Sequence, residues 1–283
     1  MEPEDVQFRT MKEEEIPLAV TWAAAEGWNP GLHDAACFSV TDPGGFFCAD
    51  ADGKVVGTVS VVNYNERFSF AGLFIVDPAY RGQGIGMQLY RYAMCHAGSR
   101  IVGCDGVVAM VEKYRRDSGL YQHYTNVRYE GRGGGIMPGG LMVIRNVRFS
   151  DLVEYDAAHF PSRRERFLRC WIAEEGHFGL ARLDDDGSIL GYGVRRTCHT
   201  GYKIGPLFAR NRATAELILE GLIAGIRGEP FSIDIPVPNT AAVRLVEDRE
   251  MLPVFSTARL YSTKEPVPLP LEEIFGVTTF ELG

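Results

Sequence analysis

A strand that passes through a glycine-rich turn directly into a helix constrains the fold of this chain more than any other feature. The stretch LFIVDPAYRGQGIGMQLYRYAM, residues 73–94, begins with an apolar run typical of a buried strand. Glycine occupies every second position over 81–86, and apolar residues at helical spacing follow. The first N–H groups of a helix have no partner within the helix, and the helix dipole adds positive charge there. The pattern therefore predicts an α/β fold with a cradle for a pyrophosphate group at a strand–helix junction.

The spacing within this turn argues against the two commonest phosphate-binding loops. A Walker loop ends in Gly-Lys-Ser/Thr, which is missing here. A dinucleotide fingerprint reads Gly-x-Gly-x-x-Gly in the first βα unit, with an acidic residue about 20 positions later. The present turn reads Arg-x-x-Gly-x-Gly, and it follows several predicted strands. An enzyme that uses ATP or NAD is therefore disfavoured.

The predicted elements occur in a similar order in the two halves of the chain. In the first half we expect a helix, a hairpin, a strand, a helix, a strand, a helix and a closing pair of strands, at 16–26, 46–65 with its turn at Asp52-Gly53, 68–76, 84–97, 106–111, 112–117, and 121–131 with 140–147. In the second half we expect two helices, a hairpin, then strand, helix, strand, helix and strand, at 151–160, 162–175, 177–196, 202–209, 211–228, 230–237, 239–249 and 252–261, with Asn239 as an N-cap. This order predicts mixed sheets of the α+β kind in two similar domains, 1–149 and 150–283.

Composition excludes several classes of protein. Of 283 residues 46% are hydrophobic and 23% charged, which is typical of a globular protein. The net charge of −8 is not that of a nucleic-acid-binding protein. An acidic N-terminus and the lack of a long apolar run predict a cytoplasmic protein without a membrane partner. The six cysteines and six histidines show no metal-binding spacing, so we expect no metal.

The glycine turn resembles the coenzyme A loop of the GNAT superfamily of N-acetyltransferases, which reads Arg/Gln-x-x-Gly-x-Gly/Ala. The resemblance implies that acetyl-CoA is the co-substrate and that its acetyl group passes directly to an amine. It implies that the backbone of Phe74, Ile75 and Val76 binds the pantetheine and acetyl groups. It also implies that the N–H groups of the turn hold the pyrophosphate, namely those of Arg81, Gly82, Gln83, Gly84, Ile85 and Gly86.

Two further segments, 25–38 and 113–131, resemble bacterial tandem acetyltransferases, in which a second and divergent GNAT-like domain follows the first. In the second half the strand ending in IGPLFA runs into RNRATA, which lacks the glycine pattern. We therefore expect one acetyl-CoA site per chain, in residues 1–149, and none in 150–283. A monomer and a homodimer are both compatible with the sequence.

In the superfamily, a tyrosine on the helix after the fifth strand usually protonates the departing thiolate. The resemblance implies that Tyr114 has this role. Tyr121 is the alternative, because the spacing from Tyr114 to Gly119 is one residue longer than usual. A purely structural role for both tyrosines stays open.

The general base and the acceptor residues are less defined. The predicted strand 68–76 has no carboxylate, and Asp77 before a proline is expected to cap a turn. An ordered water, or Glu26, Asp34 or Asp234, could accept the proton.

Trp28 and Asn29 lie in the loop that covers the substrate groove in this fold, and Trp28 could stack on a cationic amine. Asp234 is a third candidate for the acceptor side, because it is a charged residue in an apolar strand. We expect a small-molecule amine as the acceptor. The alternative is a regulatory or sensor protein that binds acyl-CoA without turnover.

Overall fold

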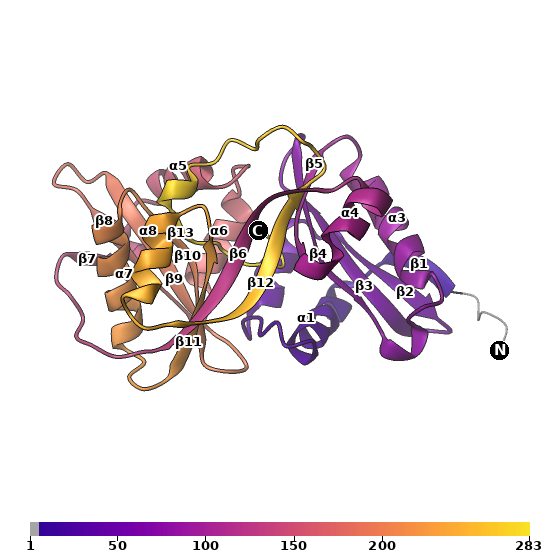
Figure 1. The fold of residues 1–283 in the computed structure, drawn as a ribbon, viewed down its shortest axis with the longest axis horizontal. Helices are drawn as coiled ribbons and strands as arrows, with labels where there is room; N and C mark the ends of the chain where they lie inside the picture. Colours follow the sequence, from indigo (N-terminus) through magenta and orange to yellow (C-terminus); the bar gives the residue numbers. More distant parts are fainter. Residues whose placement is uncertain (1–5) are drawn as a thin grey trace.

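The computed structural model describes residues 6–283, which form two halves side by side (Figure 1). The first half comprises β1 (Val6–Thr10), α1 (Ile16–Ala25), α2 (Asp34–Thr41), β2 (Phe46–Ala51), β3 (Lys54–Asn63), β4 (Phe68–Val76), α3 (Ile85–Ala97), β5 (Ile101–Val107), α4 (Val111–Ser118) and β6 (Tyr121–Arg132). The second comprises β7 (Leu141–Val143), α5 (Phe149–His159), α6 (Glu165–Ala173), β8 (His177–Leu183), β9 (Ile189–Thr197), β10 (Tyr202–Ala209), α7 (Arg212–Ala224), β11 (Pro230–Pro236), α8 (Thr240–Glu247), β12 (Leu252–Tyr261) and β13 (Ile274–Gly276).

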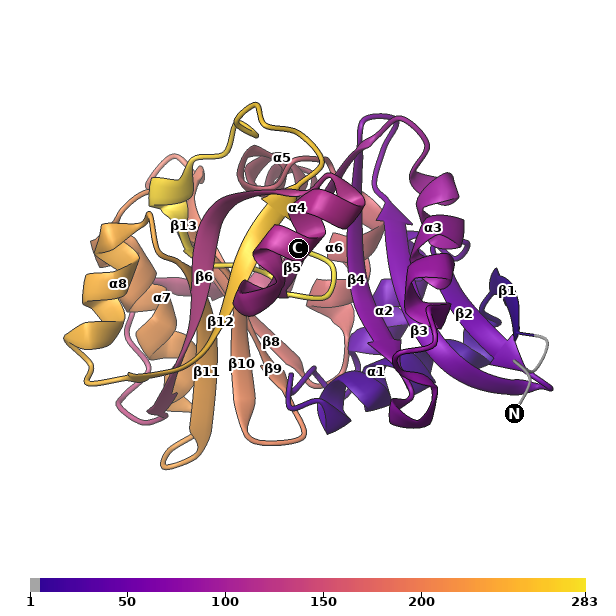
Figure 2. The same ribbon diagram turned by 45° about the vertical axis from the view of Figure 1, so that its right-hand side comes forward.

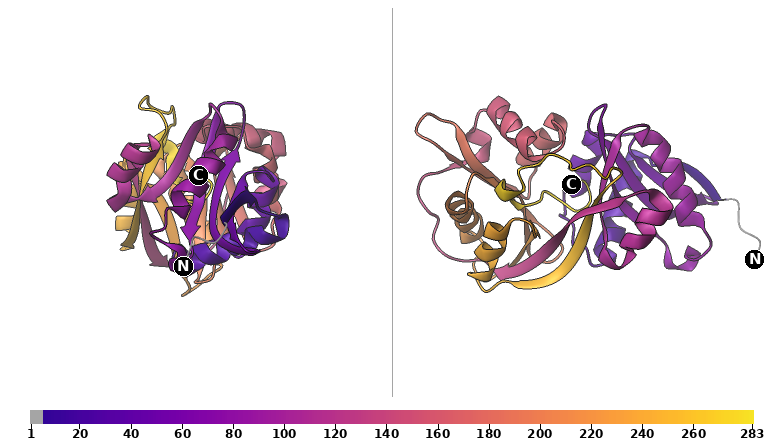
Figure 3. Two further views of the ribbon diagram at one scale, coloured as in Figure 1. Left: turned by 90° about the vertical axis from the view of Figure 1, so that its right-hand side faces the viewer. Right: turned by 45° about the horizontal axis from the view of Figure 1, so that its top comes forward.

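One 13-stranded sheet runs through both halves in the order β1-β2-β3-β4-β5-β12-β6-β11-β10-β9-β8-β7, with β13 paired to β10. The pairs β4–β5 and β10–β11 are parallel, and the other pairs in this order are antiparallel. The mixed α/β sheet predicted from the sequence is therefore confirmed. Helices cover both faces of the sheet, as the end-on view in Figure 3 shows. No helix within residues 6–283 is long and apolar enough to cross a membrane.

The strand near the C-terminus, β12, lies between β5 and β6 of the first half (Figure 2). It is antiparallel to both, with Thr257 opposite Val107 on one side and Asn126 on the other. The prediction that 121–131 and 140–147 pair with each other is wrong. β6 pairs with β12 and β11, whereas β7 pairs with β8. Proximity along the chain favoured a local pair, but the partners that β6 finds are more than a hundred residues away.

The strand predicted over 106–111 is also misplaced. β5 covers Ile101–Val107, and Val108–Met110 forms a 3₁₀ turn that leads into α4. The strand thus begins five residues earlier than predicted and contains one charged residue, Asp105. Its carboxylate is neutralised by Arg259 of β12, 2.6 Å away, so that both side chains are buried within the sheet. The charge is tolerated because the pair is closely hydrogen bonded.

Asn239 begins α8, as the sequence predicted. Its Oδ1 accepts from the Ala242 N–H at 3.0 Å, and its Nδ2 donates to the carbonyls of Glu272 and Ile274. Asn239→Ala is expected to lower the free energy of unfolding by about 1–2 kcal/mol, because it removes the cap and leaves buried carbonyls without a donor. Urea denaturation measures the loss. Asn211→Ala, which removes only the cap of α7, is the control with the smaller effect. Equal losses of unfolding free energy in the two variants would contradict the contribution of the hydrogen bonds that the Asn239 amide donates.

Candidate active site

The candidate site lies where the parallel strands β4 and β5 separate. Their pairing extends from Phe68 opposite Ile101 to Ala71 opposite Cys104. Beyond Ala71 the two strands line a pocket of about 520 Å³. Leu73 has a φ of +49°, and the register with β3 shifts at this point, which marks a β-bulge. On its β3 side β4 remains paired up to Val76, but on its β5 side the pairing ends at Ala71, so this edge of 72–76 faces the pocket.

The glycine turn closes one end of this pocket. Gly84 is the N-cap of α3 with a φ of +81°, and Gly82 has a φ of +79°. A Cβ built on Gly82 would meet no described atom within 4 Å, and one on Gly84 would meet only the Gln88 amide, at 3.9 Å. The space in front of the turn is therefore open. The first N–H groups of α3 are available there, so the residues present fit a pyrophosphate.

The structure brings most of the predicted cofactor-binding residues together. The pocket is lined by Phe74, Val76, Arg81, Gly82, Gly84, Ile85 and Gly86. The other two do not line it with their side chains. Ile75 is 6% exposed and packs into the core, and the Gln83 amide donates to the Ala79 carbonyl at 3.2 Å. For these two residues only the backbone is available to a ligand.

The side chain of Arg81 braces the turn. Its Nε donates to the Val76 carbonyl at 2.8 Å, and its Nη2 pairs with Glu26. The guanidinium therefore connects the end of β4 with the residue that follows α1. With its Nε and Nη2 engaged in this way, Arg81 would act on a bound phosphate mainly through the positive charge that it places beside the turn.

Of the two candidate tyrosines, Tyr114 lines the pocket and Tyr121 does not. The Tyr114 ring lies against Gly106, where a Cβ would come within 2.5 Å of its Cε2 atom. Burial raises the pKa of Tyr114, and a hydrogen bond with the Val107 backbone partly offsets this. Tyr121 is the first residue of β6, and its ring contacts the ammonium group of Lys264. Of the two tyrosines, only Tyr114 is therefore placed in the pocket.

One part of the pocket lining is aromatic and comes from both halves. Trp28 from the loop after α1, Phe255 from β12 and Phe280 from the C-terminal segment form it. Behind them lies the guanidinium of Arg128, at 5.7 Å from the Phe255 ring centroid and 5.1 Å from that of Phe280. Arg128 also donates to the Trp28 carbonyl at 2.8 Å. One buried cation thus contacts all three aromatic residues, which we call the aromatic wall.

Asp234 and Asn29 lie behind this wall rather than in the pocket. Both Asp234 oxygens accept from Arg128, at 2.7 and 2.9 Å. Burial alone would raise the pKa of Asp234, but the Arg128 guanidinium holds it below its usual range. Asn29 exchanges hydrogen bonds with the Thr200 backbone in both directions, so it attaches its loop to the second half. Both residues support the position of Trp28.

The carboxylates considered as bases are all engaged elsewhere. Asp77 accepts from the Ala79 N–H and pairs with Lys54, Asp34 pairs with Arg196, and Glu26 and Asp234 pair as described above. The carboxylates that do line the pocket are Asp105 and Asp117. Sequence reasoning missed Asp105 because the strand was placed too late. The signal was an aspartate within the otherwise uncharged stretch 101–111.

Comparisons with known proteins agree with this geometry. Residues 9–123 match the acetyltransferase (GNAT) family, and residues 152–276 match an acetyltransferase (GNAT) domain. The chain is 30% identical over 273 residues to the holothin acyltransferase of Pseudoalteromonas sp. (strain SANK 73390), which covers 95% of this chain and 92% of that protein. A candidate acetyltransferase from Pyrococcus horikoshii superposes with a TM-score of 0.83 at 21% identity, over 100% and 98% of the two chains. A tandem GNAT protein from the clavulanic acid biosynthesis pathway superposes with a TM-score of 0.65 at 11% identity, over 93% and 100%.

These similarities place the chain among the GNAT acyltransferases, a family whose enzymes use acyl-CoA donors. The chain belongs to the GNAT family and carries two GNAT domains in tandem.

Proposed function

We propose that this protein is an N-acetyltransferase that moves an acetyl group from acetyl-CoA to the amine of a small molecule. One observation carries the proposal. One cavity is lined by the glycine turn, by Tyr114 and by the three residues of the aromatic wall. Donor, proton source and acceptor therefore have places within one continuous space.

On the donor side, the N–H groups from 81–86 bind the pyrophosphate, and the free edge of β4 over 74–76 binds the pantetheine arm. Acetyl-CoA, when bound, supplies a thioester whose acyl carbon an amine can attack. Tyr114 holds its proton, because burial raises its pKa. That proton is available to the leaving sulfur as the carbon–sulfur bond breaks.

On the acceptor side, the aromatic wall favours an amine attached to a flat, apolar body, since aromatic rings stack on such groups and on cations. The second half closes this side through Phe255 and Phe280. This closure disfavours a lysine within an extended peptide, which needs an open groove. A small molecule fits better.

Trp28→Ala is expected to raise the KM for the acceptor by about tenfold, because one stacking surface is lost. Steady-state kinetics with the best amine of a panel measures it. Acetyl-CoA affinity should stay unchanged. Trp22→Ala is the matched control, since Trp22 lies on α1 outside the pocket lining. A wild-type KM for Trp28→Ala would contradict the placement of the acceptor.

The proposed function is tested by calorimetric titration with acetyl-CoA, ATP and NAD, followed by an assay of thiol release with an amine panel. We expect one acetyl-CoA per chain, no binding of ATP or NAD, and turnover with at least one amine. Tight binding of acetyl-CoA without turnover would instead support the alternative, an acyl-CoA sensor. Absence of acetyl-CoA binding would overturn the assignment of the pocket.

A further inference from the structure

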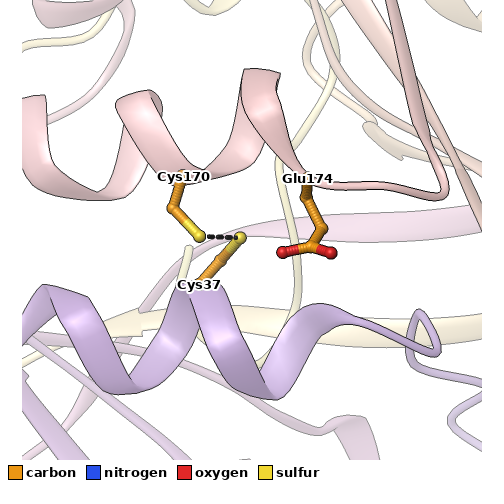
Figure 4. Close-up of side chains that lie close together, drawn as sticks. All are labelled: Cys37, Cys170 and Glu174. Carbon is orange, nitrogen blue, oxygen red and sulfur yellow. Dashed lines mark hydrogen bonds between the residues drawn. The ribbon is translucent and has the colours of Figure 1, made fainter.

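Two cysteines meet where the halves pack together, outside the candidate active site. Cys37 lies on α2 of the first half and Cys170 on α6 of the second. Their sulfur atoms are 2.7 Å apart, and the Cys37 thiol donates to the Cys170 sulfur. Figure 4 shows the two side chains pointing toward each other from facing helices, with Glu174 beside them. Both cysteines are free thiols.

One of these thiols is accessible. Cys37 is fully buried, whereas Cys170 is partly exposed and lines a groove of about 830 Å³ between the halves. Four arginines of the second half and one glutamate line the same groove, namely Arg163, Arg164, Arg166, Arg169 and Glu165. Arg163, Arg164 and Arg169 are each paired with a carboxylate, whereas Arg166 makes no ion pair with any residue within 6–283, so its charge faces the groove unneutralised. A small anionic reagent is therefore drawn toward Cys170.

We propose that Cys37 and Cys170 are a modification site, a thiol pair that forms a reversible disulfide between the two halves on reaction with an anionic low-molecular-weight disulfide. The Cys170 thiolate attacks one sulfur of the reagent, forms a mixed disulfide and releases the first reagent thiolate. The Cys37 sulfur then gives up its proton and attacks the Cys170 sulfur, and the second reagent thiolate leaves. The protein loses two hydrogens, and the reagent is reduced to two thiols.

The contact between the two thiols indicates which cysteine attacks the reagent and which one resolves the mixed disulfide. The hydrogen bond from Cys37 lowers the pKa of Cys170, which favours the thiolate at the accessible position. The same contact raises the pKa of Cys37, which donates the bond. The exposed cysteine is therefore the attacking one, and the buried cysteine resolves the mixed disulfide.

A metal ion fits this site less well. The ligand atoms of Cys37, Cys170 and Glu174 lie within 4.8 Å of one another. Tetrahedral zinc with Zn–S bonds of about 2.3 Å would hold two thiolate sulfurs about 3.8 Å apart, farther than these two. A structural zinc site also has four protein ligands, and this group supplies three. A sulfur–sulfur bond requires the smaller movement.

The test uses the full, reduced chain and oxidised glutathione as the probe. After acid quenching and alkylation, peptide mapping without reductant is expected to show the Cys37 and Cys170 peptides linked, and intact mass to show the loss of two hydrogens. In the Cys37→Ser variant the reaction should end with one glutathione attached to Cys170 as a mixed disulfide. In the Cys170→Ser variant Cys37 should remain unmodified. Cys198→Ser, which removes a buried thiol outside the pair, should link normally.

Further experiments test the role of the groove and the alternative that the two cysteines bind a metal ion. Arg166→Glu should slow the linkage, most strongly at low salt, because it reverses the charge that attracts the reagent. A wild-type rate for this variant would overturn the role of the groove. Absence of the linked peptides, or stoichiometric zinc binding to the reduced protein that Cys37→Ser abolishes, would overturn the disulfide. None of these readouts requires acetyl transfer, so the result is independent of the proposed function.

Discussion

Replacing Gly84 by phenylalanine is expected to weaken acetyl-CoA binding by about a hundredfold or more, as measured by calorimetric titration. A Cβ at this position points into the open space of the cradle, where only the Gln88 amide lies within 4 Å. The added ring would occupy the place of the pyrophosphate. The loss of two or more charge-assisted hydrogen bonds, each about 1.5–3 kcal/mol, accounts for an effect of this size.

A matched control separates the loss of the cradle from backbone strain. Gly84 has a φ of +81°, and Gly53, in the turn between β2 and β3, has a φ of +83° with no described atom within 4 Å of its Cβ position. Gly53→Phe therefore introduces the same strain at a residue that does not line the pocket. It should bind acetyl-CoA like the wild type. Wild-type affinity in Gly84→Phe would remove the basis for the pyrophosphate site.

Tyr114→Phe is expected to lower turnover by about 10²–10⁴-fold while acetyl-CoA affinity changes little, because the variant keeps the ring but lacks the acidic proton. Stopped assays of thiol release at saturating substrates measure the change. The pH profile gives a second readout. Tyr114 acts in its protonated form and burial raises its pKa. Wild-type turnover should therefore persist above pH values near the usual tyrosine pKa of about 10.

Tyr121→Phe is the control for this prediction. The Tyr121 ring lies at the start of β6, against Lys264, and outside the pocket lining. It should retain wild-type turnover. If Tyr121→Phe loses turnover and Tyr114→Phe does not, the proton donor is Tyr121. If neither variant changes, neither Tyr114 nor Tyr121 serves as the acid.

The glycine turn was predictable because its signals are local. Alternating glycines at 82, 84 and 86 permit positive φ, and the apolar spacing that follows specifies a helix. The same holds for the cap at Asn239, where an amide precedes a helical pattern by one position. Each of these features depends on residues within a few positions of one another, so a single sequence contains the necessary information.

The aromatic wall and the placement of β12 depend on contacts between distant residues. Phe255 and Trp28 are brought together by Arg128, and Asp105 is neutralised by Arg259, at sequence separations of 100 residues or more. Strand edges offer the same N–H and C=O groups whatever their partner, so an apolar strand pattern does not specify its neighbour. The sequence predicted that 252–261 is a strand. It contained no signal for the sheet in which that strand lies.

The position of β12 has a consequence for synthesis of the protein on the ribosome. β5 and β6 leave the exit tunnel long before Tyr261, yet each has one edge that only β12 covers. Until β12 has been synthesised, the nascent chain therefore presents two unpaired strand edges, which associate readily with other chains. We expect the first half to reach its final form only after β12 has been made. A chain that is truncated before β12 is accordingly expected to aggregate rather than to form a donor-binding domain.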